Sequence, residues 1–138
     1  MRTLHLGLRV ADRARSLAFY TALGYEVVGE VPETGIGHLT MIRLPGDEFV
    51  TIELVDDPTQ RPVAGVSRLS HFVIGVESLD LLLAALAARG IEAEAPTSAD
   101  GSADFLTTSV VDPDGNRIEL VQWPPGHADG ITAADWAG

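Results

Sequence analysis

The sequence contains one pattern twice, at an offset of 66 residues. The matching positions are His5 with His71, Val10 with Val76, Gly24 with Gly90, Gly35 with Gly101, and Ile52-Glu53-Leu54-Val55 with Ile118-Glu119-Leu120-Val121. In each half the His precedes the Glu by 48 positions. Several matches at a single offset indicate a duplicated structural unit, and a duplication of this kind determines the architecture.

Each half predicts a βαβββ unit, with one strand, one helix and then three short strands. Asp12 and Ser78 are suited to cap the starts of the helices, and Gly24 and Gly90 to end them. We expect strands near 3–10, 25–30, 37–44 and 49–55, and again near 70–76, 91–95, 105–111 and 116–122. The predicted organisation is a first module at 1–55, a linker at 56–69, a second module at 70–123 and a C-terminal tail at 124–138.

The composition excludes several classes of protein. The 138 residues carry a net charge of −11, which leaves no basic surface for nucleic acid and disfavours an anionic membrane surface. No apolar run approaches the ~20 residues that span a bilayer, and the start lacks a secretory apolar stretch. The absence of cysteine excludes disulfides, Cys-bound zinc and thiolate catalysis, and fits a cytoplasmic protein.

Side-chain alternation along the strands separates the polar groups from the helix. In the first strand Leu4, Leu6, Leu8 and Val10 share the face that should pack on the helix, so His5, Gly7 and Arg9 share the other face. Glu53 also points away from the helix, because Ile52 and Leu54 point toward it. The second half repeats this arrangement with His71 and Glu119. Each unit therefore has a helix on one side and a His and a Glu on the other.

The two His–Glu pairs predict a single metal site. One His on a strand is more often a hydrogen-bonded structural residue, and one Glu is usually solvated. Two such pairs at matched positions favour ligation by His5, Glu53, His71 and Glu119. Imidazole and carboxylate ligands together suit Zn, Ni, Co, Fe or Mn, and four of them leave room for water or substrate. His38 and His127 have no repeat partner, and we assign them no role.

At this point the residues resemble the vicinal oxygen chelate superfamily, and most closely its bacterial glyoxalase I branch, over roughly residues 1–123. The Phe-Tyr…Leu-Gly and Asp-Pro-Asp-Gly segments mark the superfamily but not the reaction, whereas the His/Glu/His/Glu quartet is more specific. The segments that carry the resemblance are Leu4-His5-Leu6-Gly7-Leu8-Arg9-Val10, Ser16-Leu17-Ala18-Phe19-Tyr20, Leu23-Gly24-Tyr25, Ile52-Glu53-Leu54, Ser70-His71-Phe72 and Asp112-Pro113-Asp114-Gly115-Asn116-Arg117-Ile118-Glu119-Leu120.

The resemblance implies an α+β fold, with a curled, barrel-like mixed sheet around a metal cleft and the helices outside. It implies a small-molecule substrate, the hemithioacetal of methylglyoxal and a thiol, whose two vicinal oxygens face one divalent transition metal ion that stabilises an enediolate. Glu119 would remove and return the proton, and Glu53 would complete the site and assist. It also implies a homodimer in which each metal site draws one unit from each chain.

Two departures from the glutathione-using branch bear on the thiol. Arg9 matches an Arg that holds the glutamyl carboxylate there, but Asp57 stands in place of its partner Asn. The stretch that usually carries a Lys or Arg for the glycyl carboxylate contains Asp100 and Asp104. Acidic groups there would repel glutathione.

Two other functions remain open for this sequence. One is an Fe(II)-dependent oxygenase or oxidase of the same superfamily, acting on an aromatic natural product. Such an enzyme needs open coordination positions on the metal for both substrate and O₂, and four protein ligands leave fewer of them. The other is a metal-independent binding protein, against which the intact quartet argues.

Overall fold

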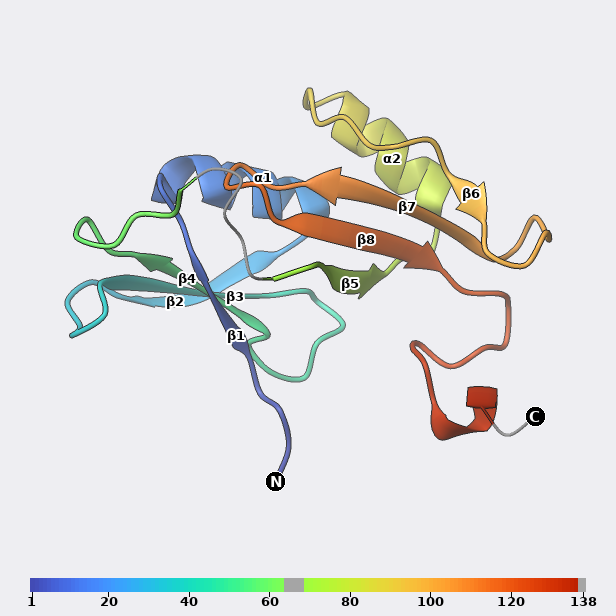
Figure 1. Cartoon of the computed structure of the whole chain (residues 1–138), viewed down its shortest axis with the longest axis horizontal. Coiled ribbons are helices and arrows are strands. Elements are labelled where there is room, and N and C mark those ends of the chain that lie inside the picture. Colours follow the sequence, from blue (N-terminus) through green and yellow to red (C-terminus); the bar gives the residue numbers. More distant parts are fainter. Residues whose placement is uncertain (64–68, 137–138) are drawn as a thin grey trace. The chain divides into compact units, whose positions relative to one another are not determined.

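The computed structural model describes residues 1–63 and 69–136. Two four-stranded sheets form, with strand orders β1-β4-β3-β2 and β5-β8-β7-β6 (Figure 1). The predicted α+β class and the two βαβββ modules are confirmed. The elements, in chain order, are β1 (Leu6–Arg9), α1 (Arg13–Leu23), β2 (Glu26–Val31), β3 (His38–Arg43), β4 (Ile52–Asp56), β5 (Phe72–Gly75), α2 (Leu79–Ala87), β6 (Thr97–Ser98), β7 (Leu106–Val111), β8 (Arg117–Gln122) and the short 3-10 helix η1 (Ala133–Trp136).

The repeat seen in the sequence is also a repeat of hydrogen-bond register. β1 pairs with β4 in parallel, with Leu6 opposite Ile52, and β5 pairs with β8 in parallel, with Phe72 opposite Ile118. Both members of the first pair lie 66 residues before the members of the second. In each unit the third and fourth strands are antiparallel. The same residues of each half therefore occupy the same places in their sheets.

Both helices begin at the predicted caps. The Asp12 carboxylate accepts a hydrogen bond from the Arg15 N–H, and Gly24 ends α1 in the left-handed region with φ 107°. The Ser78 hydroxyl accepts from the Leu81 N–H at the start of α2. α2 ends at Ala87, and Gly90 follows in a left-handed turn rather than directly capping the helix.

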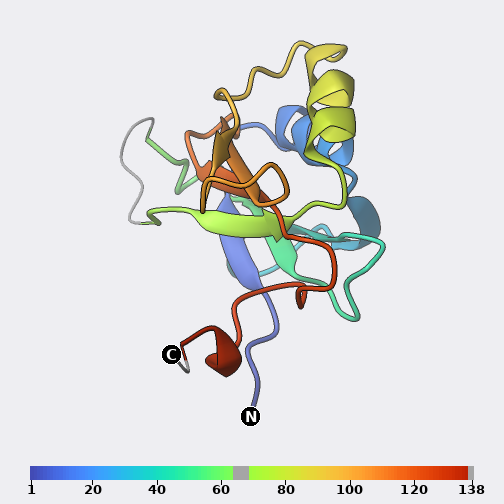
Figure 2. The ribbon, with the colours of Figure 1, turned by 90° about the vertical axis from the view of Figure 1, so that its right-hand side faces the viewer.

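Each helix covers one face of its own sheet, as Figures 1 and 2 show for α2 and the second sheet. On α1 the buried side chains include Phe19, Tyr20 and Leu23, and on α2 they include Leu79 and Leu86. The strand residues of alternate positions complete these cores, because successive side chains point to opposite faces. The buried apolar strand residues on the helix side are Leu8, Ile42, Ile52 and Leu54 in the first unit and Ile74, Val110, Ile118 and Leu120 in the second.

The strand predicted at 91–95 is not formed. The alternation of Ile91-Glu92-Ala93-Glu94-Ala95 imitates a strand, yet this segment has no ladder partner. It is fixed at one point, where the Glu94 N–H donates to the Ser109 carbonyl and the Thr108 hydroxyl donates to the Glu94 carbonyl. Pro96 has no N–H to continue the pairing. The edge strand β6 comes later and is only two residues long.

The contacts divide the chain into two compact units: Met1–Arg68 with Asp112–Gly115, and Leu69–Val111 with Asn116–Gly138. In the first unit the 112–115 turn is bonded to α1 and the residue before its cap. The Tyr20 hydroxyl donates to Asp112 over 2.7 Å, and Asp114 accepts from the Ala11 N–H and the Ser16 hydroxyl. The Phe-Tyr segment of α1 and the Asp-Pro-Asp-Gly turn, which both mark the superfamily in the sequence, are therefore hydrogen-bonded to each other. The linker predicted at 56–69 and the tail predicted at 124–138 lie partly outside the described residues.

Candidate functional site

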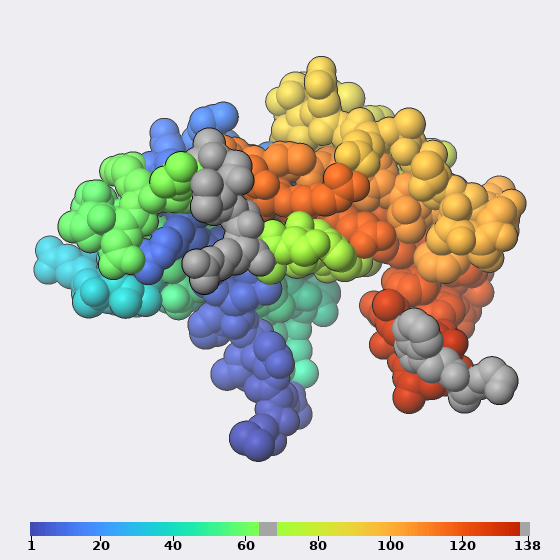
Figure 3. Space-filling model, viewed as in Figure 1, coloured from blue at the N-terminus to red at the C-terminus, as the bar shows by residue number. Residues whose placement is uncertain are grey.

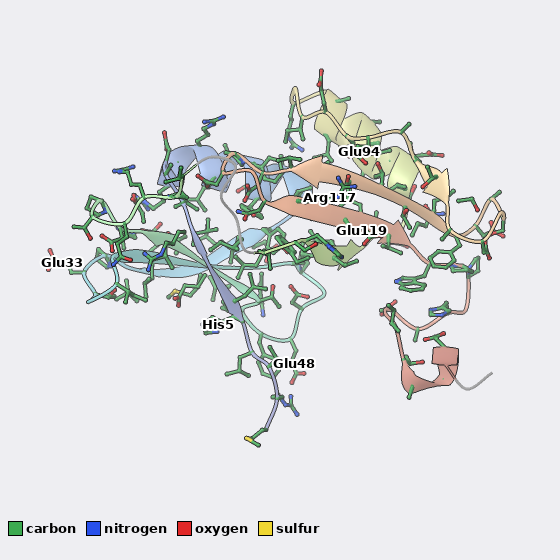
Figure 4. The ribbon with its side chains drawn as sticks, in the orientation of Figure 1. His5, Glu33, Glu48, Glu94, Arg117 and Glu119 are labelled. Carbon is green, nitrogen blue, oxygen red and sulfur yellow. The ribbon has the colours of Figure 1, made fainter. Side chains whose placement is uncertain are left out.

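Each unit brings one predicted His and one predicted Glu together on the face of its sheet opposite the helix, here called the helix-free face. His5 Nε2 lies 3.7 Å from Glu53 Oε2, and His71 Nε2 lies 3.7 Å from Glu119 Oε2. The parallel register explains the contact. Gly7 lies opposite Glu53, and His5 is two residues before Gly7, so its side chain points to the same face as that of Glu53. In the second unit Val73 lies opposite Glu119, and His71 is two residues before Val73. His5 and Glu119 are labelled in Figure 4.

The geometry of each pair fits two ligands of one ion. Metal–ligand distances of about 2.0–2.2 Å to His nitrogen and carboxylate oxygen place two such atoms about 3.0 Å apart at a right angle and about 3.4 Å apart at a tetrahedral angle. The observed 3.7 Å requires a shift of only a few tenths of an ångström. At this separation neither pair forms a direct hydrogen bond, so the imidazole nitrogen and the carboxylate oxygen that face each other do not saturate one another.

Within residues 1–63 and 69–136, no three His, Asp or Glu side chains gather closely enough to hold an ion. Each unit by itself supplies two ligands, fewer than the three or four that protein zinc sites use. The meeting of His5, Glu53, His71 and Glu119 at one ion therefore stays a prediction.

The basic side chain that lies beside Glu119 on the same face of β8 is Arg117, and it is already hydrogen-bonded to a different carboxylate. Arg117 stands two positions before Glu119 and donates both of its terminal nitrogens to Glu94, over 3.0 and 3.1 Å (Figure 4). This bidentate bond to Arg117 is the main reason that the pKa of Glu94 lies below its usual range. Because Glu94 holds Arg117, the positive charge on this strand is offset by a group other than Glu119.

Arg9 lies next to Asp57 on the helix-free face of the first unit. Arg9 Nη1 is 3.8 Å from Asp57 Oδ2, while Asp57 Oδ1 accepts from the Thr59 N–H and hydroxyl over 2.8 and 2.7 Å. Hydrogen bonds from Thr59, and then the Arg9 charge, lower the pKa of Asp57, so this carboxylate is ionised at neutral pH. The residue predicted to bind substrate thus has an anionic neighbour.

Two histidines that we assigned no role do have partners. His38 Nε2 lies 3.2 Å from Glu30, which also accepts from Arg13 of α1. His127 Nε2 lies 2.9 Å from Asp135, and its ring stacks on Trp123 with centroids 4.4 Å apart. The single-sequence pattern carried no signal for either contact, because neither His has a counterpart in the other half.

The chain belongs to the glyoxalase/bleomycin resistance protein/dioxygenase superfamily. The model of that family matches residues 2–120. Among curated proteins, a probable lactoylglutathione lyase of Vibrio cholerae is 30% identical over 131 residues, which cover 92% of this chain and 94% of that protein. The family resemblance stated from the sequence is thereby confirmed.

Solved structures share the fold. The trypanothione-dependent glyoxalase I of Leishmania major is 28% identical with a TM-score of 0.71, over 88% of this chain and 86% of that one. A glyoxylase/bleomycin resistance protein/dioxygenase domain from Frankia is 21% identical with a TM-score of 0.75, over 92% and 95% of the two chains. No helix in the described part of the present chain is long and apolar enough to cross a membrane.

Proposed function

We propose that the protein is a metal-dependent lyase or isomerase of the glyoxalase I type. The observation that carries this proposal is the matched pair of His–Glu contacts, His5 with Glu53 and His71 with Glu119, at 3.7 Å in both units. Its substrate is the hemithioacetal of methylglyoxal and a thiol, or a closely related compound with two vicinal oxygens. The similarity to a probable lactoylglutathione lyase supports the same reaction.

The four side chains have distinct tasks in this reaction. His5, Glu53, His71 and Glu119 would hold one divalent ion of Ni, Co, Zn, Fe or Mn, and when bound that ion would supply the Lewis acidity that makes removal of the substrate proton easier. Glu119 takes the proton from the carbon that bears sulfur. It then returns the proton to the neighbouring carbon, which converts the hemithioacetal into a thioester of a 2-hydroxy acid.

The exposure of the two carboxylates supports Glu119 as the base. Its side chain is 35% exposed, against 17% for Glu53. A base must reach the substrate carbon, so the more accessible carboxylate is better placed, and the more enclosed Glu53 is suited to remain a ligand and to assist. Arg117 does not neutralise Glu119, because it is held by Glu94.

We further propose a cytoplasmic homodimer in which each metal site takes one His–Glu pair from each chain. Each unit offers two ligands, and a second chain is one source of the other two. The expected dimer is checked by light scattering after size exclusion. A monomer that binds the metal at full stoichiometry would refute the sharing between chains.

The reaction is tested with metal-free protein reconstituted separately with Ni, Co, Zn, Mn and Fe(II). We expect thioester formation from methylglyoxal with at least one thiol, and none in the metal-free protein. If the reconstituted protein forms no thioester with any of these metals and any thiol, the proposal is contradicted. Oxygen uptake with Fe(II) and an aromatic diol in the same preparation would point to the oxygenase alternative.

A further inference from the structure

The first unit contains a cavity of about 380 Å³ between two of its loops. Pockets that hold small molecules commonly measure about 300–1,000 Å³, so this volume suits a small ligand. The turn between β2 and β3 forms one wall and the segment after β4 forms the other, coloured cyan and green at the same edge of the unit in Figures 1 and 3. The lining residues that carry a charge, an imidazole or an apolar ring are Pro32, Glu33, His38, Asp56, Pro58 and Arg61.

The cavity lies on the face of the first sheet that α1 covers. Side chains alternate along β4, so Asp56 shares its face with the buried Leu54, whereas Glu53 points to the helix-free face. His38 lies directly opposite Asp56 in the ladder of β3 and β4. The sheet therefore separates a ligand in the cavity from His5 and Glu53, and such a ligand need not compete with a metal ion there.

Hydrogen bonds and close packing hold both walls of the cavity in place. In the turn, the Thr34 hydroxyl donates to the Gly37 carbonyl over 2.6 Å. Gly37 itself lies so close to β4 that an added Cβ would stand 2.5 Å from the Asp56 carbonyl oxygen. On the other wall Arg61 donates from Nη1 to the carbonyl of Ala11, the residue before the cap of α1. A cavity with fixed walls binds a ligand with a smaller loss of conformational entropy.

Asp56 supplies an acceptor that has no donor in the part of the chain that the structure describes. Its Oδ1 is buried and accepts no hydrogen bond from residues 1–63 or 69–136. The two nearby cavity residues with N–H groups are directed elsewhere. His38 Nε2 lies 3.2 Å from Glu30, and Arg61 Nη1 donates to a backbone carbonyl. A buried carboxylate oxygen without a donor is costly, so a ligand that donates a hydrogen bond to Asp56 would be stabilised.

The charges around the cavity favour a positively charged ligand. Asp56 and the exposed Glu33, which is labelled in Figure 4, carry two negative charges against the single positive charge of Arg61. A cation is attracted by both carboxylates, whereas an anion is attracted by Arg61 alone and repelled by the other two. The net charge of −11 on the whole chain acts in the same direction.

An organic cation suits this cavity better than a metal ion. No three His, Asp or Glu side chains in the described part of the chain lie close enough to hold an ion. The rings of Pro32 and Pro58, one on each wall, instead offer apolar contact to a carbon skeleton. A ligand with an ammonium group and a small apolar body uses both the carboxylates and the proline rings.

We propose that this cavity is a second ligand site, which binds a primary ammonium on a small apolar body. The ammonium donates to Asp56 and is further attracted by Glu33, while the apolar body lies between Pro32 and Pro58. The inference goes beyond the proposed function, because the site uses neither the His–Glu pairs nor the substrate of the lyase.

Three small probes of nearly equal shape test the charge that the cavity selects. Benzylammonium, benzyl alcohol and phenylacetate are titrated at one ionic strength into isotope-labelled, metal-free protein and followed by the shifts of backbone amide resonances. We expect benzylammonium to bind about tenfold more tightly than benzyl alcohol, as one charge-assisted hydrogen bond provides, and phenylacetate to bind more weakly than either. The largest shifts should fall on the amides of Thr34, Gly37 and His38.

Matched substitutions assign the selectivity to the two carboxylates. Asp56→Asn keeps the size of the side chain and should lower the affinity for benzylammonium about tenfold, to that of benzyl alcohol. Glu33→Gln removes an exposed charge and should lower it about twofold. Glu48→Gln removes an equally exposed charge from the turn at the other end of β3, also labelled in Figure 4, and should leave the affinity unchanged.

The outcomes separate a built site from general attraction to an acidic protein. Equal affinities of benzylammonium and benzyl alcohol for the unmodified protein would overturn the inference, as would shifts centred outside the cavity lining. Equal losses in Glu33→Gln and Glu48→Gln would overturn it as well. If Asp56→Asn does not fold, the ranking of the three probes and the two exposed variants still decide. Because the protein is metal-free and the probes do not react, a failure of the lyase assay leaves this result standing.

Discussion

The hydrogen bond between Tyr20 and Asp112 should be a measurable part of the stability of the first unit. Tyr20 is fully buried and Asp112 is 4% exposed, and the hydroxyl donates to the carboxylate over 2.7 Å. Burial, and then the nearby Asp112 charge, raise the pKa of Tyr20, so the phenol stays protonated and remains a donor. Tyr20→Phe keeps the ring and removes only this donor from a buried carboxylate.

A hydrogen bond to a charged group contributes about 1.5–3 kcal/mol to the free energy of unfolding. With an unfolding entropy of about 2.1 cal/mol/K per residue, a chain of 138 residues should lose about 5–10 °C in Tm. Urea unfolding and calorimetry at pH 7 measure both quantities. Tyr25→Phe is the matched control, because Tyr25 is also buried and its hydroxyl has no hydrogen bond in the part of the chain that the structure describes.

The comparison of the two variants shows whether the loss of stability comes from the hydrogen bond to Asp112. Tyr25→Phe should change the free energy of unfolding by less than about 0.5 kcal/mol. Equal losses in Tyr20→Phe and Tyr25→Phe would show that the effect comes from burying a phenol and not from the bond to Asp112. No loss in either variant would refute the account of how the 112–115 turn is held to α1.

Three further predictions concern the site, the tail and the fold. Glu119→Gln should lower kcat about 10²–10⁴-fold in steady-state assays of the reconstituted enzyme with an unchanged circular dichroism spectrum, and a nearly normal kcat would exclude Glu119 as the base. The Ala128 carbonyl, and then Asp135, raise the pKa of His127, while Thr132, and then His127, lower that of Asp135. Protection of residues 124–136 from hydrogen exchange should therefore be full below the ordinary His pKa of 6.5 and fade as the pH rises through the raised value; at the acid end it is lost as the pH falls through the lowered pKa of Asp135. His127→Gln should remove the loss of protection at the alkaline end and leave the loss at the acid end, because Thr132 contributes most to the lowered pKa of Asp135. A protection factor in the unmodified chain, corrected for the intrinsic exchange rate, that stays constant as the pH rises through the neutral range would contradict the assignment. Gly37→Ala should cost about 1–3 kcal/mol in urea unfolding, because φ is +115° and a Cβ would stand 2.5 Å from the Asp56 carbonyl oxygen, whereas Gly35→Ala meets nothing within 4 Å and serves as its control.

Periodicity and repeat matching predicted what depends on local pattern. The faces of the strands, the caps Asp12 and Ser78, and the pairing of each His with its Glu followed from alternation and the offset of 66. Local pattern failed where strand formation depends on a neighbouring strand. Residues 91–95 alternate like a strand but form no ladder with another strand. Local pattern identified the segment that contains Asp112 and Asp114 but not their hydrogen-bond partners, which lie 92–103 positions away in sequence.

The contacts at the end of the second unit could not be predicted from the sequence either. Trp123, His127 and Asp135 meet through a tail that shows no periodicity, so only the fold reveals their stack and ion pair. In the space-filling view this segment, coloured red, continues from the body of its unit beyond β8 (Figure 3). The contact between Arg9 and Asp57 could be anticipated only in part, because the sequence placed Asp57 as a substitute for Asn without showing that it faces the Arg9 guanidinium.

The central claim is that the two His–Glu pairs are halves of one metal site, and metal stoichiometry tests it most directly. Zinc titration by calorimetry, with elemental analysis of the dialysed protein, should find one ion per chain. His5→Ala and His71→Ala should each abolish tight binding of that ion, because each removes a ligand from the same site. Two ions per chain in the unmodified protein, with one retained in either variant, would contradict the claim and show two independent sites.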